Sequence, residues 1–303
     1  MPGIINTGSF PKALQLGVRA WFGNYARPAP IYSHLFNTIK SDMSYEEYIQ
    51  EIRTGVGVVK NQGQSVSYDS MQQGFATRIS NAIVALGIQI THEEIINNKY
   101  PKLGKSRVES LKNSLYEAQE IMGANIFNRA FNSAYQYGDG TQLIGTAHPN
   151  ISGGTWSNAA AVPQDLSEQA IEDMLVQIDT AVDDRGNQLP MRGLKLVGAP
   201  ANKFIATRIM KSMGQSGNDN NDLNAIRSLN ELPGGFISNR YFKAPNAWFI
   251  TTDVPEGLIF QEREAMQIRE DNDTDTFNYK VLAYVNYAFG VADVHSLYGS
   301  NGP

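Results

Sequence analysis

The chain has no cysteine among its 303 residues, which excludes disulfide bonds and thiolate metal sites. Charged residues make up only 18% of it, below the usual quarter. With a net charge of −5 it lacks the basic excess of a dedicated duplex-binding protein. No apolar run approaches the roughly 20 residues that cross a bilayer, and the N-terminus has no signal-peptide pattern. We expect a protein made in a cytosol, without a membrane partner, and stabilised by packing and assembly.

Motifs that would indicate an enzyme are incomplete. His92 and Glu93 begin like a zinc-protease signature, but position 96, where the second histidine belongs, is Ile96. Gly55-Val56-Gly57 lacks the third glycine of a dinucleotide loop. No Gly-x-Ser-x-Gly or phosphate-binding loop occurs. The sequence therefore predicts no catalytic residue and no cofactor.

Metal-binding patterns fail in the same way. Residues 271–275 resemble the start of a calcium loop, but Thr276 replaces its glycine and Leu282 replaces its bidentate glutamate. A solvated turn between strands is the simpler interpretation. The four histidines have no ligand spacing; they are His34, His92, His148 and His295. We therefore expect no metal site.

Apolar residues spaced by three and four predict a long helix over 106–137, about 45 Å in length at 1.5 Å per residue. Ser106 can cap its start and Gly138 marks its end. A short helical turn is predicted at 93–98, broken by Pro101. Further helices are expected after Asp165 or Ser167 and over 201–213.

Strand patterns occupy other segments. A β-hairpin is predicted over 53–79, with Val56 and Val58 opposite Val66 and Tyr68 and a turn at 60–63. It has too few large apolar residues to be stable alone. Short strands are expected at 86–90, 194–197, 248–251 and 258–260, and odd-numbered apolar residues predict one long strand over 277–291. The fold class is therefore α+β.

Residues 1–52 are punctuated by Gly and Pro but rich in aromatic residues. Such a segment must cover an apolar surface, either on its own core or on a neighbouring molecule. Both interpretations stay open from spacing alone.

Four ordered segments carry a family resemblance. They are residues 86–94, residues 145–149 with Gly153-Gly154, residues 194–200 and residues 287–300. In this order the chain resembles the major capsid proteins of tailed bacteriophages, which share the fold of the Hong Kong 97 phage coat. Within that family it is most similar to the major head subunits of phage Mu and Mu-like prophages.

The resemblance implies a Hong Kong 97-type division of the chain. The expected parts are an N-terminal arm at 1–52, an extended loop at 53–80, a peripheral domain at 81–160 with a spine helix at 92–137, an axial domain at 161–245, and return strands of the peripheral domain at 246–303.

The resemblance also implies a structural role without enzymatic activity. Copies of the chain would form hexamers and pentamers of an icosahedral shell, which encloses double-stranded DNA without sequence-specific binding. Further expected partners are a scaffolding protein, a portal and decoration proteins. The protein would belong to the virion and would be assembled in the cytoplasm of the host bacterium.

Inter-subunit contacts are expected from the arm and the loop. The candidates are Trp21, Phe22, Tyr25, Tyr32, Val56, Val58, Lys60, Val66 and Tyr68. Some family members also join a loop lysine to an asparagine of a neighbour, and Lys60, Asn278 and Asn286 are the residues that could do so here. The short arm departs from members with a cleaved scaffolding segment, so a separate scaffold or a processed chain is expected.

Two other hypotheses stay open. One is an α+β enzyme with a site built from the loop around Gly138–Pro163, which turnover would reveal. The other is a different phage structural protein, such as a tail component, or an encapsulin-like compartment shell. A particle containing a genome rather than an enzyme cargo would separate the virus from the compartment.

Overall fold

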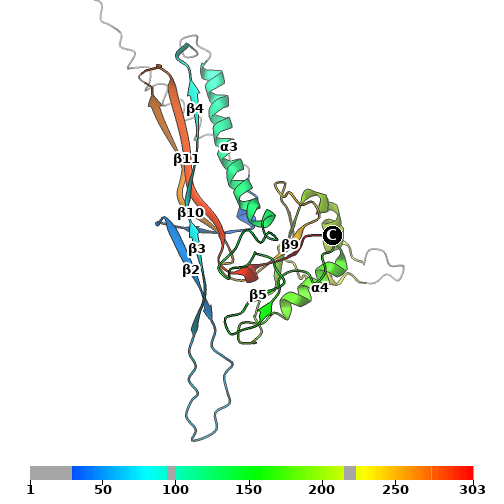
Figure 1. Ribbon diagram of the computed structural model, residues 1–303. Helices are drawn as coiled ribbons and strands as arrows, with labels where there is room; N and C mark the ends of the chain where they lie inside the picture. Colours follow the sequence, from blue (N-terminus) through cyan, green and yellow to red (C-terminus); the bar gives the residue numbers. More distant parts are fainter. Residues whose placement is uncertain (1–28, 94–99, 215–222, 274, 303) are drawn as a thin grey trace, which may run out of the picture.

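The computed structural model describes residues 29–93, 100–214, 223–273 and 275–302, with the backbone alone over 100–105. The molecule is elongated (Figure 1). A long sheet and helix α3 form one half, a rounder part with a second sheet and helices α4 to α6 lies beside it, and a long loop extends away from α3.

The long sheet has the strand order β1-β10-β11-β4. Its strands are β1 (Asn37–Lys40), β10 (Leu258–Asn272), β11 (Tyr279–Val291) and β4 (Ala82–Ile90). Tyr279, Val281, Ala283, Val285 and Tyr287 of β11 are all buried, which confirms the predicted apolar face at odd positions. Phe277 is not part of the strand, because it is exposed in the left-handed region at φ 56°.

Helix α3 (Tyr100–Asn128) packs along β4 and β11 of this sheet. Val108, Leu111 and Leu115 form the predicted stripe, against Ile90 and Val281. Pro101 does not break the helix, because it lies in the first turn, where its missing N–H is not needed. Of the predicted turn at 93–98, residues 94–98 lie outside the described residues.

The predicted end of this helix at Tyr137 is wrong. Beyond Asn128 the chain makes turns, in which the side chain of Asn132 accepts a hydrogen bond from the Ala134 N–H. The carbonyl of Ala130 accepts from the Ile144 N–H of the returning chain. These contacts satisfy backbone groups that would otherwise continue the helix.

The second sheet has the order β12-β9-β7-β8. It consists of β12 (Leu297–Ser300), β9 (Trp248–Thr252), β7 (Gly193–Gly198) and β8 (Phe236–Ser238). Strands β9 and β12 come from the expected return region 246–303, whereas β7 and β8 come from the expected axial region 161–245. One sheet therefore joins both regions.

Three helices cover one face of this second sheet: α4 (Glu168–Asp179), α5 (Lys203–Lys211) and α6 (Ala225–Leu229). Ser167 caps α4 by accepting from the Ala170 N–H, so the predicted start of this helix is confirmed. Short elements complete the fold: β5 (His148–Pro149), β6 (Thr155–Trp156), η2 (Tyr32–His34), η3 (Pro200–Asn202) and η4 (Val294–Ser296).

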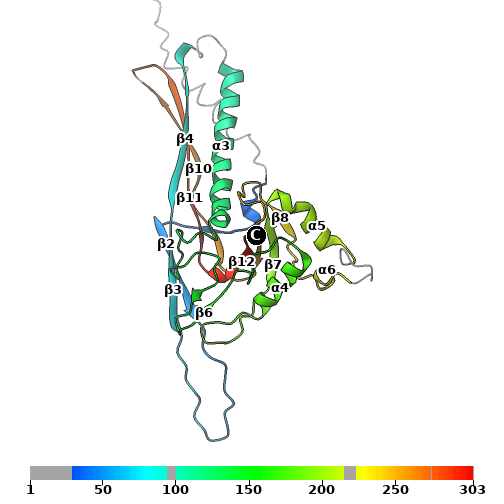
Figure 2. The same cartoon turned by 45° about the vertical axis from the view of Figure 1, so that its right-hand side comes forward.

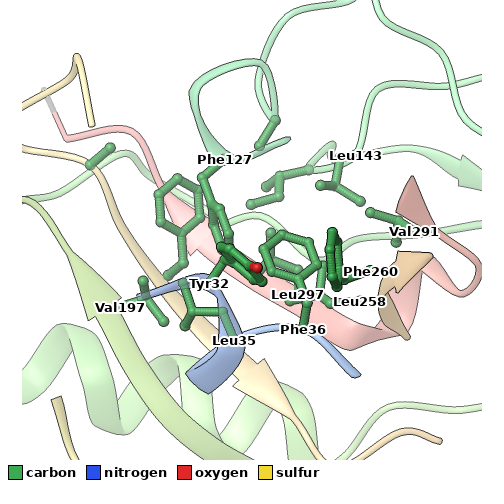
Figure 3. Packing of buried hydrophobic residues seen from close by; sticks show 14 of the residues in the cluster. Tyr32, Leu35, Phe36, Phe127, Leu143, Val197, Leu258, Phe260, Val291 and Leu297 are labelled. Atoms are coloured by element: carbon green, nitrogen blue, oxygen red, sulfur yellow. The ribbon is translucent and has the colours of Figure 1, made fainter. Parts of the chain in front are cut away.

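The largest buried cluster lies where both sheets and the end of α3 meet (Figure 3). Tyr32, Leu35 and Phe36 enter it from the segment before β1, and Phe127 enters it from α3. The Tyr32 ring lies 4.8 Å from that of Phe260. From Ile31 onward, the segment before β1 thus covers the chain's own core.

The predicted hairpin exists, but its strands differ from the prediction. The paired strands are β2 (Tyr45–Ile52) and β3 (Gln72–Ser80), which are antiparallel. Val56, Val58, Val66 and Tyr68 belong to no strand. The alternating pattern alone does not make a strand here, because these four residues have no backbone hydrogen-bonding partner among the described residues.

Candidate assembly surface

Residues 53–71 form the extended loop that leaves the body beyond β2 and β3 (Figures 1 and 2). Every residue from Arg53 to Met71 is exposed. Tyr68 keeps 93% of its surface accessible and Val59 87%. The other exposed apolar side chains of the loop are Val56, Val58, Val66 and Met71. Such a group of exposed apolar side chains marks an interaction surface.

The backbone of this loop is also available. Between Val56 and Tyr68 one backbone hydrogen bond is found in the described structure, from Gln64 N–H to the Asn61 carbonyl. It closes the tip, where Gly63 has φ 85°, so the predicted turn at 60–63 is confirmed. The two halves of the loop, on either side of its tip, can therefore offer both apolar side chains and main-chain donors and acceptors to another molecule.

The neck of the loop is held in place by Asp69. Its carboxylate accepts hydrogen bonds from the backbone N–H groups of Gly55, at 2.7 Å, and Ser70, at 2.8 Å. Arg185 donates to the same carboxylate at 2.5 Å and to the Ser70 carbonyl at 2.8 Å. These backbone bonds, followed by the guanidinium, hold the pKa of Asp69 below its ordinary value. The loop is thus anchored to the turn that contains Arg185.

Sequence reasoning missed both residues of this anchor. Arg185 lies in the turn after α4, and no motif in the sequence connects it with the loop. Asp69 is the one acidic residue in the segment 53–80. A single carboxylate in an otherwise neutral or basic loop is the signal that could have identified it.

The structure separates the expected contact residues into three groups. Val56, Val58, Lys60, Val66 and Tyr68 are exposed on the loop. Tyr32 is buried in the chain's own core, so its predicted role as an exposed contact is wrong. Trp21, Phe22 and Tyr25 lie outside the described residues.

The cross-linking candidates differ in accessibility. Lys60 is exposed near the loop tip. Asn286 is buried within β11, which leaves it out of reach of a neighbour's lysine. Asn278 is half-buried, and its side chain accepts from the His92 N–H. Of the two asparagines, only Asn278 remains a candidate.

The segment 138–164 contains a buried network of polar side chains. His148 is fully buried, with Nδ1 2.5 Å from Asp139 and Nε2 2.9 Å from Asn158 Oδ1. Asn158 Nδ2 donates to the carbonyls of Leu143 and Leu297, which fixes its Oδ1 as the acceptor toward His148. Both ring nitrogens are therefore occupied by structural contacts.

Trp156 joins this network to the C-terminal segment. Its indole stacks on His295 at 3.9 Å and on His148 at 4.8 Å. Asp293 holds Nδ1 of His295 at 2.8 Å. Two Asp–His pairs thus enclose one tryptophan and fasten the loop 138–164 to the region before β12.

A cleft of about 210 Å³ opens beside these residues, lined in part by Asp139, Asp183 and Asp293. Burial opposes ionisation of all three. Hydrogen bonds from His148 to Asp139, from Asn187 to Asp183 and from His295 to Asp293 outweigh burial, so each pKa is lowered. Carboxylates held ionised in this way accept structural hydrogen bonds and are poor proton donors.

No group of three or more His, Cys, Asp or Glu side chains with metal-binding geometry occurs in the described ranges. Among the helices in those ranges, none is long and apolar enough to cross a membrane.

Comparison with known proteins agrees with a shell-forming fold. Solved structures with the same fold include the capsid of a native GTA particle, with a TM-score of 0.59, 11% identity and 91% of each chain covered. The capsid of Myoviridae phage XM1 matches with a TM-score of 0.52, 13% identity and 100% of each chain covered. A chain of Mycobacterium phage Adephagia matches with a TM-score of 0.54, 10% identity and 92% coverage of each. The fold is thus that of tailed-phage capsid subunits, of the Hong Kong 97 type.

The family follows from the sequence itself. Residues 80–298 match the family model described as phage capsid protein. The chain belongs to this family and is a major capsid protein of a tailed phage, a component of the virion shell. The match does not distinguish the Mu-like branch. No curated protein matches the chain.

Proposed function

We propose that copies of this chain assemble into hexamers and pentamers of a closed icosahedral shell around double-stranded DNA. The observation that carries the proposal is the extended loop 53–71, which presents apolar side chains and backbone groups that its own fold does not cover. Each contact is modest, since burial contributes about 25 cal/mol per Å² before the costs of association. Many such contacts per subunit make a closed shell stable through multivalency.

The same proposal covers the remaining partners. The net charge of −5 suits a wall that encloses DNA without gripping it, because phosphate neutralisation needs clustered Lys and Arg. A scaffolding protein, a portal and decoration proteins complete the shell, and assembly takes place in the host cytoplasm. The chain acts as a structural subunit and not as an enzyme, in keeping with the occupied nitrogens of His148 and the ionised carboxylates beside it.

The test is assembly of the full chain with and without the loop. In the variant, a four-residue Gly-Ser turn replaces residues 56–68 and leaves Gly55 and Asp69 in place, so that the neck contacts persist. Electron microscopy and sedimentation should show shells or capsomers for the wild type, and folded, unassembled protein for the variant. Shells of normal size from the loop variant would contradict the role of the loop.

A second deletion tests the N-terminal arm. We expect a chain without residues 1–28 to fold, because the described core cluster begins with Ile31 and Tyr32, which this deletion retains. Its assembly should be impaired if the arm contacts neighbours. Normal shells from this variant would remove the arm from the proposal and leave the loop as its basis.

A further inference from the structure

Helices α4, α5 and α6 cover the same face of the second sheet, but over opposite edges. In the order β12-β9-β7-β8, helix α4 contacts β12 and helix α5 contacts β8. Their inner sides share one core, to which α4 contributes Ile171 and Met174 and α5 contributes Ala206 and Ile209. In Figure 2, α5 lies beside β8, whereas α4 lies away from that strand. Their outer sides therefore face different neighbours.

The outer side of α5 and α6 is basic with an apolar centre. We call it the basic surface; its exposed residues are Lys203, Phe204, Arg208, Lys211, Arg227 and Leu229. Phe204 keeps 72% of its surface accessible. Helix α5 contains no acidic residue. An exposed phenylalanine with Lys203 before it and Arg208 one helical turn after it suits an acidic and partly apolar partner.

The outer side of α4 has the complementary character. We call it the acidic surface; it consists of Glu172, Asp173, Val176 and Asp179. Val176 is 62% accessible at its centre. Helix α4 contains no Lys or Arg, and within the described part of the chain no basic side chain pairs with Asp173 or Asp179. Among the described residues, the acidic surface thus has no cationic partner in its own subunit.

We propose that the basic surface of one copy binds the acidic surface of a second copy, and that this contact repeats head to tail around a ring. The inference rests on the proposed function and specifies which surfaces meet. Opposite edges of one sheet cannot pair within the same subunit. A heterologous contact between two different surfaces closes into a ring when the rotation permits. Phe204 and Val176 become the buried centre and the charges form the rim.

Charge also decides the direction of this contact. Pairing of two basic surfaces, or of two acidic surfaces, places like charges against each other and is disfavoured. Opposite surfaces attract, and the attraction is screened by salt over about 8 Å at 0.15 M ionic strength. Ring formation by the full chain is therefore expected to weaken as ionic strength rises.

Reversal of the charges provides the test. The first variant carries Asp173→Lys and Asp179→Lys, and the second carries Lys203→Glu and Lys211→Glu. In the second variant, Lys203→Glu places a favourable negative charge at the start of α5, and Lys211→Glu places an unfavourable one at its end. The two effects on the interaction with the helix dipole offset each other. Circular dichroism melts should show both variants folded.

We expect each single-surface variant to require an assembly concentration at least about tenfold higher than the wild type, a change of about 1.4 kcal/mol. The matched control carries all four substitutions in one chain. It restores opposite charges at every contact, so it should assemble at close to the wild-type concentration. If either single-surface variant assembles as readily as the wild type, or if the four-substitution chain fails while folded, the inference is wrong.

A mixture of the two single-surface variants gives a sharper result. One variant then has two basic surfaces and the other has two acidic surfaces, so they can pair only in alternation. Rings with an even number of subunits can close, and five-membered rings cannot. Light scattering and electron microscopy should show six-membered rings without closed shells. Five-membered rings in the mixture would overturn the proposal, whereas failure of the wild type to assemble would overturn the proposed function instead.

Discussion

Arg185 and Asp69 are joined at 2.5 Å although 116 residues separate them in the sequence. Through this contact the turn after α4 holds the neck of the extended loop. An exposed ion pair contributes little to global stability. Its consequence is therefore local: it sets the direction in which the loop leaves the body.

The first prediction concerns this anchor. Arg185→Ala should leave the melting temperature almost unchanged, while hydrogen exchange and proteolysis at Lys60 become faster because the loop neck loses two contacts. Arg192→Ala is the matched control, since Arg192 pairs with Asp253 at the surface and does not contact the loop. Equal protection of the loop in both variants would show that Arg185 does not anchor it.

The second prediction separates assembly from folding. Val58→Asp places a charge on a side chain that is 79% accessible, so stability should change by no more than about 0.5 kcal/mol. Shell formation should nevertheless be lost, because the carboxylate would be buried in the contact. Sedimentation and thermal melts measure the two effects separately.

The control for this prediction is Val281→Asp, the same exchange at a fully buried position of β11. It should destabilise the fold by about 3 kcal/mol or more, because an unpaired charge enters the core. A Val58→Asp protein that melts early would place Val58 in the fold rather than in the contact.

The third prediction concerns acid stability. The lowered pKa of Asp139 stabilises the folded state fully above the ordinary pKa of about 3.9, and this stabilisation is lost as pH falls through the lower folded value. Asp139→Asn should cost about 1–3 kcal/mol at pH 7, because the contact with buried His148 loses its charge. The fall in stability below pH 4 should also become shallower.

Melting temperatures between pH 7 and pH 3 test this expectation. Asp42→Asn, at an exposed aspartate, serves as the control and should follow the wild type. An Asp139→Asn protein with the wild-type acid profile would mean that other carboxylates account for it.

The fourth prediction concerns the contact of the hairpin with the long sheet. A Cβ at Gly290 would lie within 3.0 Å of three side-chain atoms of buried Ile79 in β3. Gly290→Ala should therefore destabilise the protein by about 1–3 kcal/mol through overpacking. Ile79→Ala in the same chain should relieve the clash, so that a double-mutant cycle shows coupling. Additive effects of the two substitutions would contradict the close packing.

Several features of the fold could be predicted because they are local. The alternation along β11 is visible in the sequence, since a strand with one buried face repeats every two residues. The cap at Ser167 and the turn with Gly63 follow from side-chain chemistry and backbone freedom at single positions. The exposure of Val58 and Tyr68 also followed from a segment with too little apolar volume to form a core.

The errors share a physical cause. Val56 and Val58 alternate with glycine as in a strand, yet the paired strands are β2 and β3. Strand pairing depends on a second segment of the chain, which the alternation of one segment does not identify. The predicted end of α3 at Tyr137 lies beyond the observed end at Asn128. The helix ends early because the carbonyl of Ala130 accepts a hydrogen bond from the distant Ile144 N–H. The sequence predicts that Tyr32 contacts a neighbouring subunit, but the residue is buried in its own core. Its position there depends on the rings of Phe260 and Phe289, which follow it by more than two hundred residues.

By itself, the sequence determined the α+β class, the apolar faces of α3 and β11, and the membership in a capsid family. The tertiary structure decided which apolar residues remain outside, how Arg185 holds the loop, and that α4 and α5 present opposite charges at opposite edges of one sheet. Periodicity is a property of neighbouring residues, so a single sequence reveals it. Exposure and complementarity depend on contacts between distant segments, and only the folded chain brings those segments together.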